Sequence, residues 1–267
     1  MKNYLTSYDV TVEEVDAAAK TSVTAVKSLI EKSATATATT NARSDMEILD
    51  EPLFAHFLLE SGAPRPSRQE VLETMTAEAW ALLRQMQTPP TSEAERPHLF
   101  MKHMACHLRG FALDAFSDHH HVLLVRHPVK VLRSYSAYIS EPTMEDLGYA
   151  WQAQLLNHCH TEGWPVTVLD ADQLVHRPSE MLQALCRRLK LPWQSAMMHW
   201  PSGGRAEDGP WAKYWYQAVH ASTGWRPPAG PSVAEQRGRN ERVAERLQPL
   251  LQQCLLIHAQ LVESALT

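Results

Sequence analysis

The chain has 267 residues, of which 44% are apolar and 21% are charged, so it can bury a sizeable core and global disorder is excluded. The formal net charge of −5 argues against a protein that coats nucleic acid through bulk positive charge. No apolar run reaches the roughly 18–20 residues that a membrane span needs, and the polar start MKNYLTSYDV lacks the apolar stretch of a signal peptide. The four cysteines form no C-x-x-C pair, which fits a reducing compartment. We therefore expect a cytoplasmic protein that binds neither nucleic acid nor membrane.

Residues 1–42 differ in character from the rest of the chain. Thr11 and Glu14 have the spacing of a capping box, and apolar residues follow at roughly helical intervals as far as Ile30. The stretch SATATATTNA, residues 33–42, has the low complexity of a linker. These features predict an N-terminal helix and an Ala/Thr linker over 1–42, followed by the main domain over 43–267. An N-terminal helix packed on that domain is the alternative.

The remainder of the chain alternates short apolar runs with helical patterns. The expected strands are 46–49, 98–102, 121–126 and 165–170, and the expected helices are 68–86, 178–189 and one or two within 240–266, where Pro249 could be a break. Near-continuous apolar strands separated by helices favour a parallel sheet that is covered on both faces. The predicted fold class is α/β, with a central parallel sheet flanked by helices.

The stretch LLVRHPVKVLRSYSAY, residues 123–138, indicates an anion site. An apolar strand ends at Arg126, a helix begins near Pro128, and Ser134 lies on that helix. Ligands of open α/β sheets bind at the carboxyl ends of strands, where a helix start offers free N–H groups and an arginine matches phosphate oxygens. Without further evidence, a surface arginine paired with a carboxylate is the alternative.

The spacing Arg-x-Pro-x5-Ser resembles the 3′-phosphate-binding segment of sulfotransferases that use 3′-phosphoadenosine 5′-phosphosulfate (PAPS). Two later stretches, VTVLDADQLVHRPSEMLQALCRRLKLPW (166–193) and DGPWAKYWYQAVHASTGW (208–225), are similar to segments of a bacterial and plant branch of that family. The resemblance implies a sulfotransferase fold related to the P-loop NTPases, with PAPS as co-substrate. It also implies that Arg126 and Ser134 hold the 3′-phosphate and that Arg205 and Lys213 contact the nucleotide.

The resemblance also suggests catalytic roles in sulfuryl transfer to a hydroxyl or amine of a small-molecule acceptor. Glu51 directly follows a predicted strand and would be the base, as a glutamate is in related carbohydrate sulfotransferases; an acid favoured at a helix start is the alternative. Lys102 would stabilise the oxygen that leaves. His103 is the further candidate base, although the family has Lys-x-His where this chain has Lys-His. We expect no metal, since fourteen histidines make chance clusters common.

One expected feature is missing from the sequence. Sulfotransferases bind the 5′-phosphosulfate with a loop, usually containing glycine, between their first strand and first helix. This chain has no glycine between Met1 and Gly62, and close backbone approach to a phosphate commonly needs one. Two hypotheses follow: a PAPS-dependent sulfotransferase, or a nucleotide-binding or interaction protein that keeps the fold without the activity. An N-terminus foreign to the domain would explain the missing glycines equally well.

Overall fold

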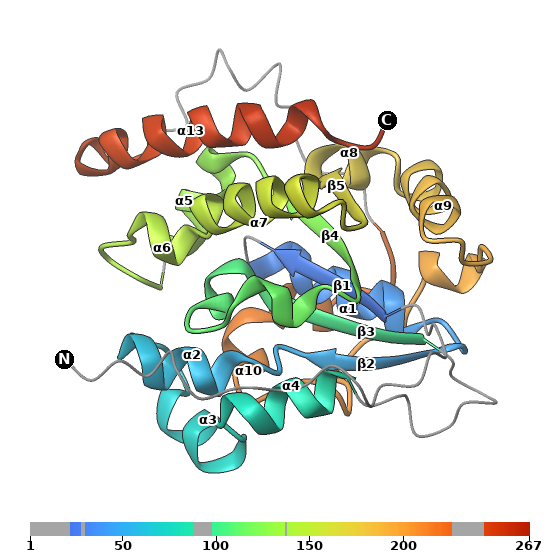
Figure 1. Ribbon diagram of the computed structural model, residues 1–267, viewed down its shortest axis with the longest axis horizontal. Coiled ribbons are helices and arrows are strands. Elements are labelled where there is room, and N and C mark those ends of the chain that lie inside the picture. Colours follow the sequence, from blue (N-terminus) through green and yellow to red (C-terminus); the bar gives the residue numbers. More distant parts are fainter. Residues whose placement is uncertain (1–21, 28–29, 88–97, 137, 226–242) are drawn as a thin grey trace.

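The structure, a computed structural model, describes residues 22–27, 30–87, 98–136, 138–225 and 243–267 (Figure 1). Its first half contains β1 (Ser22–Lys27), α1 (Ile30–Asn41), β2 (Met46–Asp50), α2 (Phe54–Ser61), α3 (Arg68–Thr74), α4 (Ala79–Gln87), β3 (His98–Met104), η2 (Ala105–Leu108), η3 (Leu113–Phe116) and β4 (His119–Val125). Its second half contains α5 (Pro128–Ser136), α6 (Met144–Leu147), α7 (Tyr149–Glu162), β5 (Val166–Asp170), α8 (Ala171–His176), α9 (Pro178–Arg188), η4 (Ser195–Met198), α10 (Ala212–Trp215), α11 (Gln217–His220), η5 (Glu245–Leu247) and α13 (Gln248–Glu263).

Five parallel strands form the sheet in the order β2-β3-β1-β4-β5. The four strands expected from the sequence, β2 to β5, are confirmed, with ends that differ by at most two residues. The fifth, β1, lies at the centre of the sheet. The predicted α/β class with a parallel sheet flanked by helices is therefore confirmed.

Residues 22–42 differ from the prediction. Residues 22–27, expected in an N-terminal helix, form β1 between β3 and β4, and the stretch expected to be a linker forms most of α1. Alanine favours a helix, and Thr37, Ala38 and Thr39 are almost completely buried, so packing outweighs the weaker helix propensity of threonine. One strand of the sheet therefore lies before residue 43, where the sequence predicts the start of the main domain. The predicted capping box at Thr11 and Glu14 lies outside the described residues.

Two other predicted helices have different limits. The expected helix 68–86 is two helices, because Met75 has extended backbone angles (φ −114°, ψ 145°) that end α3 before α4 begins. Near the C-terminus, Pro249 lies in the first turn of α13 rather than at a break, a position where its missing N–H costs no helical hydrogen bond. The predicted helix 178–189 is confirmed as α9. No helix of the described residues is long and apolar enough to cross a membrane.

Helices cover both faces of the sheet. On one face α5, α7 and α13 pack together, and their apolar side chains meet Leu123, Val125 and Val168 from the strands. On the other face Phe100, Leu124 and the helices α8 and α9 share a second cluster. Figure 1 shows α13 (red) beside α7, while α2, α3 and α4 gather beyond β2 at the opposite end of the sheet.

The order of the strands reverses at β1. The chain continues from β1 to β2 and β3 on one side, and then to β4 and β5 on the other. In such sheets ligands bind in the crevice at the carboxyl ends of the strands where the order reverses. In this protein that crevice lies where β1 leads into α1 and β4 leads into α5.

Candidate functional site

Arg126 lies at this crevice, directly after the last residue of β4. In the sheet register Lys27, the last residue of β1, is opposite Leu124 of β4, so the ends of the two strands lie side by side. The arginine residue is 8% exposed, and its carbonyl accepts a hydrogen bond of 2.6 Å from the Tyr149 hydroxyl. Ser134 lies half-buried on α5, the helix that follows. The structure thus places both predicted phosphate ligands on the strand–helix unit expected of them.

A buried network of ionisable groups lies at the end of β2. Lys102 of β3 forms ion pairs with Glu51 and with Asp50, the latter at 3.3 Å between Nζ and Oδ1. The Tyr216 hydroxyl donates to Asp50 Oδ2 at 2.8 Å, accepts from Lys102, and accepts from Trp211 Nε1 at 3.0 Å. Asp50 and Lys102 face one another because they are paired in the register of the parallel strands. The structure therefore brings together two of the three predicted catalytic residues.

Glu51 reaches this network through an unusual backbone conformation. Its φ is +50°, in the left-handed region that residues other than glycine rarely adopt. The conformation turns the chain from β2 towards α2, and the Glu51 amide donates to the Lys102 carbonyl at 2.8 Å. Strained angles of this kind concentrate at functional sites, where the surroundings hold them in place.

Burial raises the pKa of the Glu51 carboxyl above its ordinary value. The positive charge of Lys102 opposes this shift, while the nearby Asp50 carboxylate adds to it. Burial and the two carboxylates also raise the pKa of Tyr216 well above 10, so its hydroxyl keeps its proton. With one lysine facing two carboxylates, a proton taken up by Glu51 would relieve the repulsion between the carboxylates.

His103 does not join these groups. Successive residues of a strand point to opposite faces, so His103 points away from the face that carries Lys102. It is fully buried, and neither ring nitrogen has a hydrogen-bond partner among the described residues. Burial lowers the pKa of His103 to about 3, with the nearby His119 adding to the effect. The next residue of β3 that points to the same face as Lys102 is Met104.

The structure separates Arg205 and Lys213, the two basic residues expected at the nucleotide. The Arg205 guanidinium donates to one oxygen of Asp208, Oδ1, from Nε at 3.1 Å and from Nη2 at 2.7 Å, and it lies 6.0 Å from the centre of the Tyr216 ring. The Lys213 side chain is 54% exposed and pairs with Glu70 at 2.5 Å. Arg205 therefore adjoins the buried network, while Lys213 lies on the surface. Their predicted contacts with a nucleotide stay predictions.

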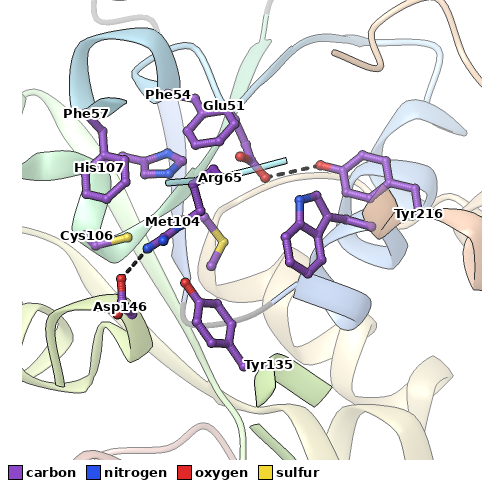
Figure 2. A pocket seen from close by; sticks show the side chains of 11 residues that line it. Glu51, Phe54, Phe57, Arg65, Met104, Cys106, His107, Tyr135, Asp146 and Tyr216 are labelled. Carbon is purple, nitrogen blue, oxygen red and sulfur yellow. Dashed lines mark hydrogen bonds and ion pairs between the residues drawn. The ribbon is translucent and has the colours of Figure 1, made fainter. Parts of the chain in front are cut away.

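A small pocket opens beside Glu51 (Figure 2). Its walls are largely aromatic, and most of the aromatic residues come from α2, η2, α5 and α10. They include Phe54, Phe57, Tyr135, Trp215, Tyr216, Met104, Cys106 and His107, together with an ion pair between Arg65 and Asp146. Tyr135 is the neighbour of Ser134 on α5, so the pocket and the crevice at Arg126 share that helix. Lys102 pairs with Glu51 but does not line the pocket.

Sequence reasoning missed Asp50 and the role of Tyr216. Asp50 ends β2, and a carboxylate at the end of a parallel strand next to Glu51 was a usable signal. Tyr216 lies in the stretch 208–225 that resembles the family, and nothing in the sequence gives its hydroxyl a role. Its hydroxyl is 166 positions away from Asp50 in the chain, a distance that no local pattern can reveal. Among the described residues there is no group of three side chains that could hold a metal ion.

The fold defines an α/β protein whose parallel sheet has helices on both faces and whose strand order reverses at β1. A family model described as a sulfotransferase domain matches residues 26–247, and the chain belongs to this family. The match begins within β1, upstream of the boundary expected at residue 43. The predicted family is thereby confirmed.

Comparison with individual proteins adds detail. Branched-chain-amino-acid aminotransferase-like proteins 2 and 1 of Arabidopsis thaliana are 33% and 34% identical over 187 residues, which is 70% of this chain. The chain spans only 33% of the length of either relative. The solved sulfotransferase domain of the Synechococcus PCC 7002 olefin synthase is 13% identical, with a TM-score of 0.50, over 94% of this chain and 98% of that domain. This last likeness supports the fold alone.

Proposed function

We propose that this protein is a PAPS-dependent sulfotransferase that transfers a sulfuryl group to a hydroxyl or amine of a small-molecule acceptor. The observation that carries the proposal is the position of the Glu51–Lys102 pair at a pocket that shares α5 with Arg126 and Ser134. One helix thus connects a candidate donor site with a candidate acceptor site.

In the proposed reaction the acceptor oxygen or nitrogen attacks the sulfur of PAPS while Glu51 removes its proton. The bond between sulfur and the bridging oxygen breaks, and adenosine 3′,5′-bisphosphate leaves with the electron pair. Lys102 keeps Glu51 ionised and adds positive charge near the oxygen that leaves. Such a reaction asks the protein mainly for alignment and charge neutralisation. His103 has no role in this proposal, because it lies buried on the other face of the strand.

Arg126 and Ser134 would hold the 3′-phosphate, and the 5′-phosphosulfate would lie at the start of α1. β1 and α1 form the strand–helix pair that the family uses there, and α1 begins three residues after Lys27. A helix of this length offers free N–H groups and a partial positive charge at its first turn. Arg43, another basic residue near α1, is engaged elsewhere, since it forms a fork with Asp45.

The second candidate is a nucleotide-binding protein without sulfotransferase activity. The observation that favours it comes from the sequence: residues 22–41, which include β1 and α1, contain no glycine. Such a protein would bind adenosine 3′,5′-bisphosphate but would not transfer a sulfuryl group. The two candidates differ in catalysis and not in nucleotide binding.

Calorimetric titration with adenosine 3′,5′-bisphosphate and with 5′-AMP tests the donor site. We expect the bisphosphate to bind more tightly than AMP, and Arg126→Ala to abolish that preference, since losing a buried charged contact costs about 2–5 kcal/mol. Arg133→Ala is the matched control, because Arg133 is an exposed arginine on α5, the helix that follows Arg126. Equal binding of the two nucleotides, or equal loss in both variants, would exclude Arg126 as the 3′-phosphate ligand.

The same preparations then decide between the two candidates. Incubation with PAPS and a panel of hydroxyl and amine acceptors should give a sulfated product with the unmodified protein but not with Glu51→Gln. Bisphosphate binding without any product would favour the protein that lacks activity. Absence of nucleotide binding would exclude both.

A further inference from the structure

The ion pair between Arg65 and Asp146 has no role in the proposed transfer, yet it lines the pocket. Arg65 comes from the segment between α2 and α3, and Asp146 from α6. Their side chains are only 8% and 15% exposed. A buried ion pair contributes little net stability, because desolvation offsets most of its attraction. An arginine held at the wall of a largely aromatic pocket therefore calls for a ligand-based explanation.

The geometry around Arg65 leaves room for a second anion. Its guanidinium lies 5.9 Å from the centre of the Phe57 ring and 5.8 Å from that of Tyr135, so two rings hold its position. One terminal nitrogen donates to a single oxygen of Asp146 and the other donates to the Pro64 carbonyl at 3.1 Å. Arginine has five N–H donors and can bind a further carboxylate through those that remain.

Asp146 is held in place independently of Arg65. Its second oxygen, Oδ2, accepts from the Thr143 amide and from the Thr143 hydroxyl, both at 2.8 Å, in the capping box of α6. Asp146 thus contacts Arg65 with one oxygen from a fixed position and orients the guanidinium. Figure 2 shows this pair on a different side of the pocket from the pair of Glu51 and Tyr216.

The pocket is narrow between these two polar sides. Its volume is about 40 Å³, well below the roughly 150 Å³ of a cavity that binds benzene. This volume limits the part of an acceptor that lies between the two sides to a few atoms.

We propose that Arg65 binds a carboxylate of the acceptor, and that the acceptors are hydroxy acids whose hydroxyl end faces Glu51. This inference rests on the proposed function, because it treats the pocket as the acceptor site. A carboxylate at Arg65 would hold the molecule by one end and leave the hydroxyl at the other end near the base. An alcohol of the same length without the carboxylate would lack this contact.

Binding to the protein saturated with adenosine 3′,5′-bisphosphate tests the proposal without requiring turnover. Calorimetry would compare 6-hydroxyhexanoate with 1-hexanol, which lacks the carboxylate. We expect 6-hydroxyhexanoate to bind at least about tenfold more tightly than 1-hexanol, because hydrogen bonds between charged groups are stronger than those between neutral ones. Arg65→Met should remove the preference over 1-hexanol and leave the affinity for 1-hexanol unchanged.

The matched control is Arg109→Met. Arg109 also pairs with a carboxylate of α6, Glu145, at 2.5 Å, but both side chains are about 40% exposed and neither lines the pocket. This variant should keep the preference for the hydroxy acid. If Arg65→Met does not fold, Asp146→Asn replaces it. That variant removes the competing carboxylate and should tighten the binding of 6-hydroxyhexanoate.

Two results would overturn the proposal: equal binding of the hydroxy acid and the alcohol, or an equal loss for both in Arg65→Met. Either result would leave Arg65 as a structural clamp on α6. The proposed function is tested separately in the same samples, because its failure appears as missing bisphosphate binding or missing product.

Discussion

Glu51 and Lys102 form a buried ion pair although 51 positions separate them in the chain. Glu51 directly follows β2, and Lys102 lies on β3, the neighbouring parallel strand. Asp50 also pairs with Lys102, and the Tyr216 hydroxyl donates to Asp50. Few charges are buried in proteins without a functional reason or complete pairing. The predictions below test what this arrangement does.

Replacing Glu51 by glutamine should lower the rate of sulfuryl transfer by about 10²–10⁴-fold, the usual contribution of a positioned base. The amide keeps the size of the side chain but cannot take up the proton. Binding of adenosine 3′,5′-bisphosphate should stay unchanged, since the proposed donor site does not include Glu51. Steady-state kinetics and calorimetry on one preparation measure both quantities. Full activity in this variant would rule out Glu51 as the base.

The pH dependence of activity should change in opposite directions when the two neighbours of Glu51 are altered. As a base Glu51 must be ionised, so kcat/KM should rise with pH through its pKa, which burial places above the ordinary value. Asp50→Asn removes a repelling charge, lowers the pKa of Glu51 and moves the rise to lower pH. Lys102→Met removes an attracting charge, raises that pKa and moves the rise to higher pH. Profiles of kcat/KM that shift in the same direction in both variants would contradict the assignment of Glu51 as the base.

Removing the Tyr216 hydroxyl should destabilise the protein. Tyr216→Phe takes away the donor to Asp50 and the acceptor of Trp211 Nε1, and leaves those buried groups without that partner. Leaving a buried polar group unsatisfied costs about 1–3 kcal/mol, which denaturant unfolding can detect. Tyr214→Phe is the control, because Tyr214 is exposed on α10, the helix that ends just before Tyr216. Equal stability of the two variants would argue against a closed hydrogen-bond network.

Gly209→Ala should disturb the same network without touching a charged residue. A Cβ at Gly209 would lie 2.1 Å from the Trp211 ring, so the indole would have to move and its bond to Tyr216 would be lost. Gly204→Ala is the control, since its Cβ would meet its neighbours at an ordinary 3.7 Å. We expect lower stability and lower activity in Gly209→Ala only. A crystal structure of this variant with the indole in place would contradict the expectation.

Stability should fall as the pH drops below about 6.5. Burial lowers the pKa of His103 to about 3 and those of His119 and His121 to about 4, so the unfolded chain binds more protons than the folded one below the ordinary pKa. Their stabilising contribution is complete above pH 6.5 and is lost as the pH falls towards these values.

The variant His103→Leu isolates one of these groups. The free energy of unfolding should decrease less between pH 6.5 and 4 in this variant than in the unmodified protein, as measured by urea titrations. His160→Gln, a change at an exposed residue of α7, should keep the original dependence. An unchanged pH dependence in His103→Leu would show that His103 does not contribute to acid unfolding.

The sequence by itself determined the strand–helix unit that carries Arg126 and Ser134, four of the five strands and the family. These features are local, because apolar runs, proline positions and motif spacing are set by neighbouring residues. The segment SVTAVK was different, since it is short and only partly apolar. It becomes the central strand because β3 and β4 both pair with it.

Only the tertiary structure decided which chemical groups meet. It places Lys102 towards Glu51 and His103 away from it, because successive strand residues face opposite sides. It brings Tyr216 to Asp50 across 166 positions, and Arg65 to Asp146 across 81. Contacts at such separations depend on how the sheet and its helices pack, and no local pattern specifies them.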